Sequence, residues 1–497
     1  MTTQPARTTE PKWKEPGELP PASARDAAAV VGDVLLPVLA GGVIVRRPLA
    51  MRAVEKTGWD RRGIERVRGL RERYGPDPLR FSARGRTYAL VLEPEDAHRV
   101  LSGTPETFTP ATWEKRGALA QFQPHGVLVS GGQERAARRR FVEEVLDTPQ
   151  PVHRTAERLT ATVRDEAARL LGEAERSGLL TWDAFQDSWW RTVRRLVLGD
   201  AARDDRTLTE QLQQLRSAAN WSLVGPRRRD LRATFLRRVR SYVDQAAEAE
   251  RSGTGERSGT GGAAHSLAAL VAATPAAPGA DPAGQIPHWL FAYDAAGMAT
   301  MRALALLATH PAQAATARAE AAETALEGPR ELPYLRGCAL EAVRLWPTTP
   351  LILRESTEET VWRDGTLPAG TVFVLHTPYL HRGEPAEPYG DTFTPGLWTG
   401  ASEWAARANP ALLPFSSGPA GCPGENLVLL TVSTLLATLL EAHTYTLASH
   451  PGLNPSVPVP ATLDHFALRF RVHRDAVRRD AAHRDAAHRD TAHRDEG

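Results

Sequence analysis

The stretch Phe415-Ser-Ser-Gly-Pro-Ala-Gly-Cys-Pro-Gly424 decides how this 497-residue chain is interpreted. One cysteine, Cys422, stands among glycines and prolines, and a long apolar run from Leu427 to Leu440 follows it. This pattern predicts a tight loop that presents one sulfur and then continues as a buried helix. The glycines give the loop access to positive φ and a close approach to a flat ligand. The positive end of the helix would lower the pKa of the thiol.

Cysteine content restricts what Cys422 can do. The chain has 2 cysteines, which excludes a disulfide framework and a cysteine-only zinc site with its four ligands. A single thiolate at a helix start suits one soft metal centre, such as haem iron with an axial cysteine. On residue type alone, the other interpretation is a small buried cysteine in a turn.

Two further motifs precede this loop. Ala296-Gly-Met-Ala-Thr300 lies in an almost wholly apolar segment, 288–309, which predicts a buried central helix. Glu341 and Arg344 are three residues apart on a later predicted helix, so their side chains share one face. A buried carboxylate and guanidinium must pair to be tolerated, and the alternative is an ion pair on the surface.

Together the three motifs resemble those of the cytochrome P450 family, whose haem-binding loop reads Phe-x-x-Gly-x-Arg-x-Cys-x-Gly. Phe415, Gly418, Cys422 and Gly424 match that loop, and the resemblance covers roughly residues 65 to 472. It implies a mainly α fold with small β-sheets, the cytochrome P450 fold, and haem b as the cofactor. Cys422 would ligate the iron, Phe415 would shield the sulfur, and the two glycines would shape the loop.

The resemblance also implies roles for the other two motifs. Thr300 would help deliver protons, with Ala296 and Gly297 lining the helix where it widens over the iron. The structural alternative is that the Thr300 hydroxyl bonds back to a carbonyl one turn earlier. Glu341 and Arg344 would form a structural network behind the haem.

The sequence departs from the family pattern at three positions. Ala299 replaces the acid that commonly precedes the threonine, and Asp294 is a poor stand-in because it lies about 240° around the helix. We expect Asp294 to pair with an arginine instead. Leu397 replaces an arginine of the structural network, so His381 or Arg382 is a candidate substitute.

Haem propionates need cations, and the third departure concerns them. Ala420 stands where the family often has Arg or His. The resemblance leaves Arg139 and Arg354 as the propionate candidates, with His125 as a weaker one. Arg135 takes the place of a tryptophan that the family usually has four residues before the arginine at 139.

The family's chemistry gives the expected reaction. A monooxygenase would insert one oxygen atom from O2 into a small organic substrate, with electrons from NAD(P)H through a separate ferredoxin and ferredoxin reductase, because no flavin domain is appended. The Ala/Arg-rich composition indicates a GC-rich bacterial genome and hence natural-product tailoring. Because Ala299 is not an acid, a peroxide-driven, oxidative-coupling or rearranging enzyme is an alternative. A haem-binding protein without turnover is the alternative from another class.

Composition limits the partners and the organisation. The net charge of +2 gives no reason to expect nucleic acid as a partner. We expect residues 1–26 to be a disordered extension, 27–473 a single catalytic domain with a flexible loop at 251–262, and 474–497 a disordered repeat tail. The apolar run 27–45 contains Asp, Pro and Gly residues, so we expect a helix on the protein's own surface or in a membrane interface rather than a span. The expected location is the cytoplasm, with membrane association through 27–45 as an option.

Periodicity and turn signals place the other elements. Helices are expected at 60–74, 93–101, 132–146 and 266–273, and through most of 154–250. Strands are expected at 79–82, 86–92, 351–356 and 371–376. The segment 103–130 carries several turn formers and is expected to be irregular.

Overall fold

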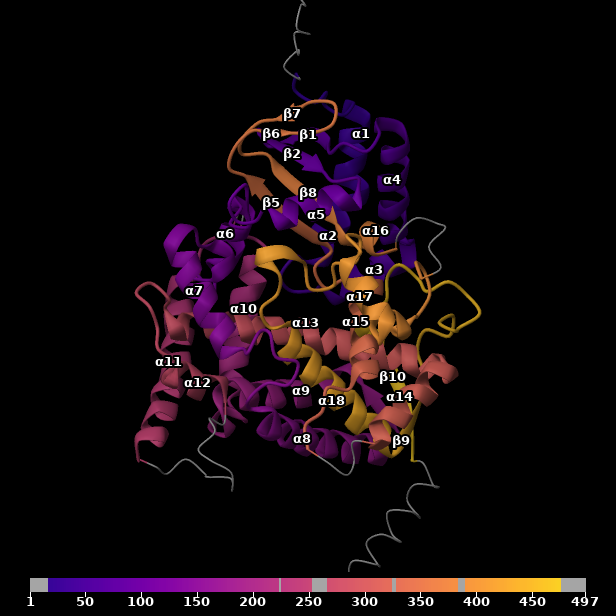
Figure 1. Cartoon of the computed structure of the whole chain (residues 1–497). Helices are drawn as coiled ribbons and strands as arrows, with labels where there is room; N and C mark the ends of the chain where they lie inside the picture. The colour runs from indigo at the N-terminus through magenta and orange to yellow at the C-terminus, as the bar shows by residue number, and fades with distance from the viewer. Residues whose placement is uncertain (1–16, 223–224, 253–265, 324–327, 383–388, 475–497) are drawn as a thin grey trace, which may run out of the picture.

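The computed structural model describes residues 17–222, 225–252, 266–323, 328–382 and 389–474. The chain forms a helical body and a smaller β-rich part that contains the N-terminal helices (Figure 1). This arrangement confirms the expected mainly α fold with small sheets. The expected flexible loop 251–262 and the repeat tail fall almost entirely outside the described residues.

The helical body is organised around one long central helix, α13 (Pro282–Thr309), which crosses the middle of the molecule in Figure 1. Its side chains are apolar on nearly all sides, so it can be covered by neighbours all round. The other helices of the body are α7 (Gly132–Val145), α8 (Ala156–Ser177), α9 (Trp182–Leu198), α10 (Arg206–Ala219), α11 (Arg229–Ser252), α12 (Leu267–Ala273), α14 (Pro311–Glu323), α15 (Pro333–Leu345) and α18 (Glu425–Glu441).

Three of these helices carry the sequence motifs and contact one another. The helices α13, α15 and α18 pack pairwise, so the threonine motif, the Glu341/Arg344 pair and the Cys422 loop converge on one region. The central helix begins at Pro282, six residues before the predicted start, and continues through Pro287. Among the described helices, only α13 is long and apolar enough to cross a membrane, and most of that apolar stretch is buried inside the protein.

The main sheet has five strands in the order β1-β2-β8-β5-β3. Strands β2 and β8 pair in parallel, and the other pairs are antiparallel. The turn between β1 and β2 has positive φ at both Arg84 and Gly85, which a tight two-residue hairpin turn favours. The strands of this sheet are β1 (Leu79–Ala83), β2 (Arg86–Leu90), β3 (Phe108–Thr109), β5 (Leu351–Ser356) and β8 (Val372–His376).

Two smaller sheets and several short helices complete the described structure. One sheet has the order β4-β10-β9 and the other pairs β6 with β7. Their strands are β4 (Leu179–Thr181), β9 (His443–Leu447), β10 (Arg469–Arg474), β6 (Thr360–Val361) and β7 (Thr366–Leu367). The remaining helices are α3 (Pro48–Thr57), α4 (Trp59–Tyr74), α5 (Pro94–Ser102), α6 (Trp113–Leu119), α16 (Thr377–Arg382), α17 (Ala401–Ala408) and the short turns η2 (Val127–Val129), η3 (Asp200–Ala202), η5 (Pro395–Trp398), η6 (Gly418–Ala420) and η7 (His465–Ala467). The segment 103–130, expected to be irregular, therefore contains a helix, α6.

Residues 17–26 have a defined position in the fold. Residues 17–26 were expected to be disordered, but they lie against the β-rich part. The main-chain N–H of Leu19 donates to Thr366 O (2.9 Å), and that of Ala22 donates to Arg80 O (2.7 Å). Leu19 is buried in the core of this part of the protein. Composition missed this contact because a proline-rich segment can add to a sheet edge through its remaining N–H groups.

The apolar run 27–45 forms α1 (Ala24–Ala29), the π-helical segment η1 (Val30–Leu35) and α2 (Leu36–Gly41). One face is buried, with Val30 and Val34 fully covered. It packs on α4, where Trp59 Nε1 donates to Gly32 O (3.1 Å). The run is thus a helix on the protein's own surface, as expected.

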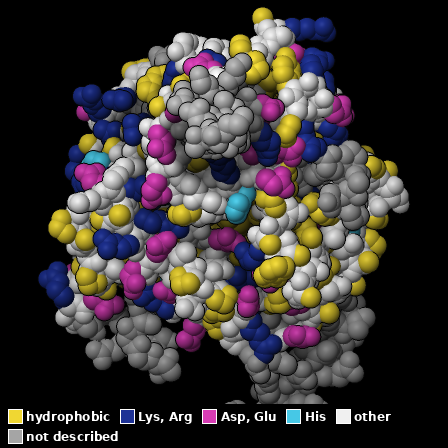
Figure 2. Space-filling model, turned by 45° about the horizontal axis from the view of Figure 1, so that its top comes forward, with side chains coloured by type: hydrophobic (Ala, Val, Ile, Leu, Met, Phe, Trp, Pro, Cys, Tyr) yellow, Lys and Arg dark blue, Asp and Glu magenta, His cyan; other side chains and the backbone are white. Residues whose placement is uncertain are grey.

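The outer surface mixes charges of both signs. Figure 2 shows Lys and Arg side chains interspersed with Asp, Glu and apolar side chains over the face in view. This distribution agrees with the net charge of +2 and shows no single-sign field on that face.

Candidate functional site: the Cys422 loop and its surroundings

The Cys422 loop is closed by a hydrogen bond between its two ends. The main-chain N–H of Cys422 donates to Phe415 O (3.0 Å), and the side chain of Phe415 packs against the main hydrophobic core. The helix α18 begins at Glu425, three residues after the cysteine. The sequence prediction of a cysteine loop followed by a buried helix is therefore confirmed.

Fewer glycines of this loop adopt positive φ than expected. Gly418 has φ +67°, and a Cβ there would lie 2.3 Å from Leu101 O. Ser416 also has a positive φ of 64°. Gly421 and Gly424 have φ of −58° and −99°, so they do not use the left-handed region that the sequence suggested for them.

The thiol of Cys422 is governed by burial. Burial raises the pKa of this thiol to about 11, against a smaller lowering by the main-chain N–H of Gly424. We expected the helix start to lower this pKa, and that expectation is wrong for the protein alone, because desolvation outweighs the helix end. A coordinated metal ion deprotonates a thiol outright and reverses this preference.

The Thr300 hydroxyl bonds within its own helix. Its Oγ1 donates to Ala296 O (2.9 Å), and the residue is fully buried. This is the back-bonded arrangement given above as the structural alternative, and the helix is continuous through it. The carbonyl of Ala296 therefore acts as the acceptor for the threonine.

Gly297 serves a packing role. A Cβ at this position would lie 2.7 Å from Nε1 of Trp189, so the glycine allows α9 to approach α13. The expectation that Gly297 opens the helix over a cofactor is wrong, because its Cα faces an indole and the helix does not widen there.

The Glu341/Arg344 pair is wholly buried, so the surface alternative is excluded. Arg344 Nε donates to Glu341 Oε1 (2.6 Å) and Nη2 donates to Oε2 (2.8 Å). The indole N–H of Trp398 and the main-chain N–H of Thr394 each donate to this carboxylate at 2.8 Å. Trp398 thus supplies a donor beside Leu397, where the expected arginine is missing.

Both candidate substitutes at 381 and 382 join this network. The carbonyl of His381 accepts a hydrogen bond from Arg344 Nη1 (3.1 Å), and its Nδ1 lies 3.1 Å from Arg344 O. Burial lowers the pKa of His381 to about 3, so the ring is neutral. Arg382 pairs with Asp391 and donates to Leu345 O (2.9 Å), which fixes the end of α15.

Three cationic residues form no ion pair with a carboxylate within the described part of the chain. Arg135 is buried, and its Nε and Nη2 atoms have no hydrogen-bond partner in the described structure. Arg354 is buried, and among the described residues it donates to Thr104 Oγ1 (3.1 Å) and Leu353 O (2.9 Å). The ammonium of Lys115 donates to Leu353 O (2.8 Å).

The three cationic groups also repel one another. Burial and then repulsion from Arg135 lower the pKa of Arg354 to about 10. Burial and then repulsion from Arg354 hold the pKa of Lys115 well below its usual value. A buried positive charge without a counter-charge costs folding free energy. An anionic ligand bound beside these side chains would lower that cost.

The other two propionate candidates have different partners. Arg139 pairs with Glu143 (2.6 Å) and donates to Gly421 O (2.7 Å), which fixes the Cys422 loop to α7. His125 is exposed and pairs with Asp281 (2.8 Å). Asp294 pairs with Arg216, as expected. Sequence reasoning missed Arg135 and Lys115, and the signal was the arginine at a position that the family usually gives to tryptophan.

Comparisons with known proteins agree with this geometry. The cytochrome P450 family model matches residues 292–459, which include all three motifs. Cyclooctat-9-en-7-ol 5-monooxygenase of Streptomyces melanosporofaciens is 26% identical over 383 residues, which is 70% of this chain and 78% of that protein. A crystal structure of a cytochrome P450, CYP102L1, superposes with a TM-score of 0.64 and 20% identity over 83% of this chain and 94% of the other.

This chain has the cytochrome P450 fold. A second P450 structure, of retinoic acid-bound cyanobacterial CYP120A1, has a TM-score of 0.63 and 17% identity over 82% of this chain and 94% of that chain. The mouse mitochondrial 1,25-dihydroxyvitamin D(3) 24-hydroxylase is 35% identical over 118 residues, 24% of this chain. Across the first five curated relatives, the match spans about a fifth to a quarter of their length.

Similarity to the P450 family implies haem, and the described residues fit it. Cys422 offers one sulfur at the start of a buried helix, which suits an axial iron ligand. The two haem propionates would face three cationic side chains, those of Arg135, Arg354 and Lys115. The propionate carboxylates would accept hydrogen bonds from the unpartnered N–H groups of Arg135. Bound haem would therefore find both a ligand for its iron and a counter-charge for its acid groups among these residues.

Proposed function

We propose that this P450 is a haem-thiolate monooxygenase, which inserts one oxygen atom from O2 into a small organic substrate. The observation that carries the proposal is the pairing of the Cys422 loop with the unneutralised cations Arg135, Arg354 and Lys115. We also propose that residues 27–473 act as one catalytic unit. The curated relatives whose names state a reaction are oxygenases, which supports the same reaction class.

Haem b bound through Cys422 supplies the reductive activation of O2. The residues of this chain supply position and protons. Thr300 Oγ1 donates to Ala296 O, which leaves its lone pairs free to accept a hydrogen bond from a water molecule. Ala299 brings no carboxylate, and Asp294 is held by Arg216. Proton transfer in this P450 therefore depends on the Thr300 hydroxyl and water.

The decisive experiment for this proposal is a spectrum of the reduced protein with carbon monoxide. We expect the far red-shifted Soret band that thiolate-ligated haem gives. The Cys422→Ser variant should lose this band. The matched control is Cys338→Ser, which changes the other cysteine, buried inside α15, and should keep it. A normal thiolate band in Cys422→Ser would overturn the proposal.

We propose that NAD(P)H supplies the electrons through a separate ferredoxin and ferredoxin reductase. Ala299 favours a second candidate, a peroxide-driven, coupling or rearranging enzyme, since such chemistry needs less proton relay. Product formed with hydrogen peroxide but not with a ferredoxin system would support the second candidate. Turnover by the ferredoxin system with stoichiometric NAD(P)H use would support the first.

The substrate is proposed to be an apolar small molecule of natural-product metabolism. The Streptomyces relative carries the name cyclooctat-9-en-7-ol 5-monooxygenase, which supports this class. A titration of the haem spin state with a panel of terpenes, fatty acids and aromatic polyketides would identify ligands that displace water from the iron. A response only to charged, water-soluble molecules would contradict the proposal.

We propose that the enzyme acts in the cytoplasm and touches membranes through segment 27–45. Its outward face exposes Val31, Leu36, Leu39 and Val43 by 40%, 45%, 50% and 42%. Trp221 lies beside this segment, because the neighbouring Asn220 hydrogen-bonds Ile44, and it is also exposed. Co-sedimentation with lipid vesicles that is lost in a Leu36→Ser/Leu39→Ser variant is the expected result.

A further inference from the structure

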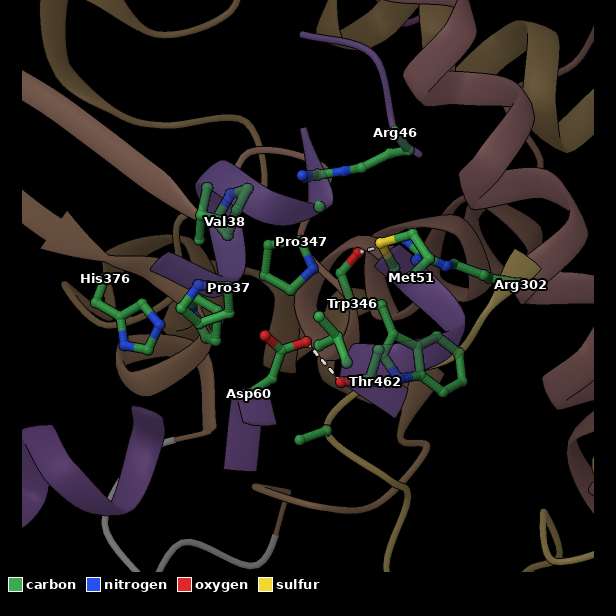
Figure 3. A pocket seen from close by; sticks show the side chains of 15 residues that line it. Pro37, Val38, Arg46, Met51, Asp60, Arg302, Trp346, Pro347, His376 and Thr462 are labelled. Carbon is green, nitrogen blue, oxygen red and sulfur yellow. Dashed lines mark hydrogen bonds between the residues drawn. The ribbon is translucent and has the colours of Figure 1, made fainter. Parts of the chain in front are cut away.

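A cavity of about 50 Å³ lies where the second half of α13 meets the N-terminal segment. Its polar lining consists of Arg46, Asp60, Arg302, His376 and Thr462, each from a different part of the chain. Figure 3 shows Arg46 on one side of Pro347, with Asp60 and Thr462 on the other. The volume accommodates a few water molecules or one small polar group.

The cavity is distinct from the site beside Thr300. Arg302 follows Thr300 by two residues, which is about 200° around an α-helix. The two side chains therefore point to nearly opposite sides of α13. A ligand in the cavity and a ligand beside Thr300 would be separated by the helix itself.

The two arginines of the cavity are held by main-chain carbonyls. Arg302 is buried, and its Nη atoms donate to Trp346 O (3.0 Å) and Leu463 O (3.1 Å). The Nη atoms of Arg46 donate to Gly42 O (2.7 Å) and Thr348 O (2.8 Å). These carbonyls orient the guanidinium groups without neutralising them, and neither arginine forms an ion pair within the described residues.

The residues that line the cavity carry more positive than negative charge, and the other acids lie outside the lining. Asp60 is the one acid in the described lining, and it accepts a hydrogen bond from Thr462 Oγ1 (2.5 Å). Outside the lining, Asp294 pairs with Arg216, and Glu55 lies 3.2 Å from His450. Asp464 accepts a hydrogen bond from the main-chain N–H of Phe466. The lining itself thus has two guanidinium groups and one carboxylate.

Two buried nitrogens of the lining have no partner in the described structure. They are Nε of Arg302 and Nδ1 of His376. Buried polar atoms are normally hydrogen-bonded, so a ligand with oxygen acceptors would satisfy a need that the protein leaves open. Because His376 is neutral, it can offer a donor without adding charge.

We propose that this cavity binds a carboxylate anion. A carboxylate matches the planar guanidinium donors, fits the volume and balances the extra positive charge. The carboxylate is either a free small acid or the acid end of a larger molecule, and the two share the same contacts. The site is independent of haem ligation, so its test and that of Cys422 can fail separately.

The test is calorimetric titration of the haem-loaded full chain with sodium acetate at constant ionic strength. We expect saturable binding of one acetate per chain and a rise of the unfolding temperature. Acetamide, which has the same shape without the charge, should not bind. Equal effects of acetate and acetamide, or no acetate binding, would overturn the proposal.

A pair of variants locates the site. Arg46→Gln should weaken acetate binding at least tenfold, and Arg46→Lys should weaken it less because the charge remains. The matched control is Arg47→Gln, since Arg47 is the next residue but stacks on Trp221 instead of lining the cavity. Unchanged acetate affinity in a folded Arg46→Gln protein would refute the assignment.

Hexanoate distinguishes a free small acid from the acid end of a larger molecule. Competition of hexanoate with acetate indicates that the cavity takes the end of a larger molecule. Failure of hexanoate to bind indicates a free small acid.

Discussion

The indole N–H of Trp189 donates to the main-chain carbonyl of Tyr293 at 2.7 Å, at the place where Gly297 has no side chain. The bond ties α9 to the central helix about two turns before Thr300. Because an indole and a helix backbone meet directly, the spacing of the two helices is fixed by a glycine rather than by interdigitated side chains.

Gly297→Ala should therefore destabilise the protein. The new Cβ would lie 2.7 Å from Trp189 Nε1, and overpacking of this kind costs about 1–3 kcal/mol. The free energy of unfolding in urea measures it. Gly69→Ala, in the middle of α4 with nothing within 4 Å of the new Cβ, should stabilise by about 0.5–1 kcal/mol. The same sign for both substitutions would contradict the packing role.

Gly418→Ala should loosen the Cys422 loop. The position combines a φ of +67° with a carbonyl 2.3 Å from the new Cβ, so we expect a loss of about 2 kcal/mol or more in unfolding free energy. Gly424→Ala is the control in the same loop, because its φ is −99° and its Cβ would make an ordinary 3.6 Å contact with Leu146. A larger loss in Gly424→Ala would show that the loop is held differently.

Glu341→Gln should be among the most damaging single substitutions. It leaves the Arg344 guanidinium buried without its counter-charge, which costs about 3–5 kcal/mol. Chemical unfolding followed by fluorescence measures the loss. Glu403→Gln breaks the exposed pair with Arg407 and should change the same free energy by about 0.5 kcal/mol or less.

Arg135→Gln should speed the loss of haem. Its unpartnered nitrogens are assigned to a propionate, and a hydrogen bond to a charged group contributes about 1.5–3 kcal/mol. Transfer of haem to an excess of an apo-globin acceptor should become roughly 10- to 100-fold faster. Arg140→Gln, on the exposed side of α7, should leave this rate unchanged, and equal rates for all three proteins would remove Arg135 from the site.

His376→Leu should make the free energy of unfolding less dependent on pH. Burial lowers the pKa of His376 to about 3, whereas an unfolded histidine titrates near 6.5. The folded state then binds fewer protons, so this contribution to stability is complete above about pH 6.5 and is lost as the pH falls toward 3. Between pH 8 and pH 5 one such histidine accounts for about 2 kcal/mol. The drop in unfolding free energy over that interval should shrink by this amount in the variant.

The sequence predicted the three motif helices well because each carries a local signature. The all-apolar segment around Thr300, the three-residue spacing of Glu341 and Arg344, and the glycine loop before α18 each determine their own structure. Their convergence also followed from resemblance to one family. The hairpin at Arg84 and Gly85 was predictable for the same local reason.

What could not be predicted depends on which groups meet in space. Arg139 and Arg135 lie on the same helix. Only the structure shows that Glu143 neutralises Arg139, while Arg135 forms no ion pair with a described carboxylate. The role of Gly297 depends on an indole more than a hundred residues earlier in the chain. The desolvation that raises the pKa of the half-buried Cys422 thiol likewise depends on the surrounding fold rather than on the loop sequence.

The hydrogen bonds of Asn220 have a practical consequence. Its side chain accepts from the N–H of Ile44 (2.8 Å) and donates to Val45 O (2.8 Å), while Arg216 Nη2 donates to Ile44 O (3.2 Å). Truncation up to residue 45, a common way to reduce aggregation, would remove the hydrogen-bond partners of Asn220 and Arg216. It would also remove Val30 and Val34 from the hydrophobic core. Polar replacement of Leu36 and Leu39 is the better route to a soluble protein. It changes only the exposed face and keeps the hydrogen bonds between this segment and α10.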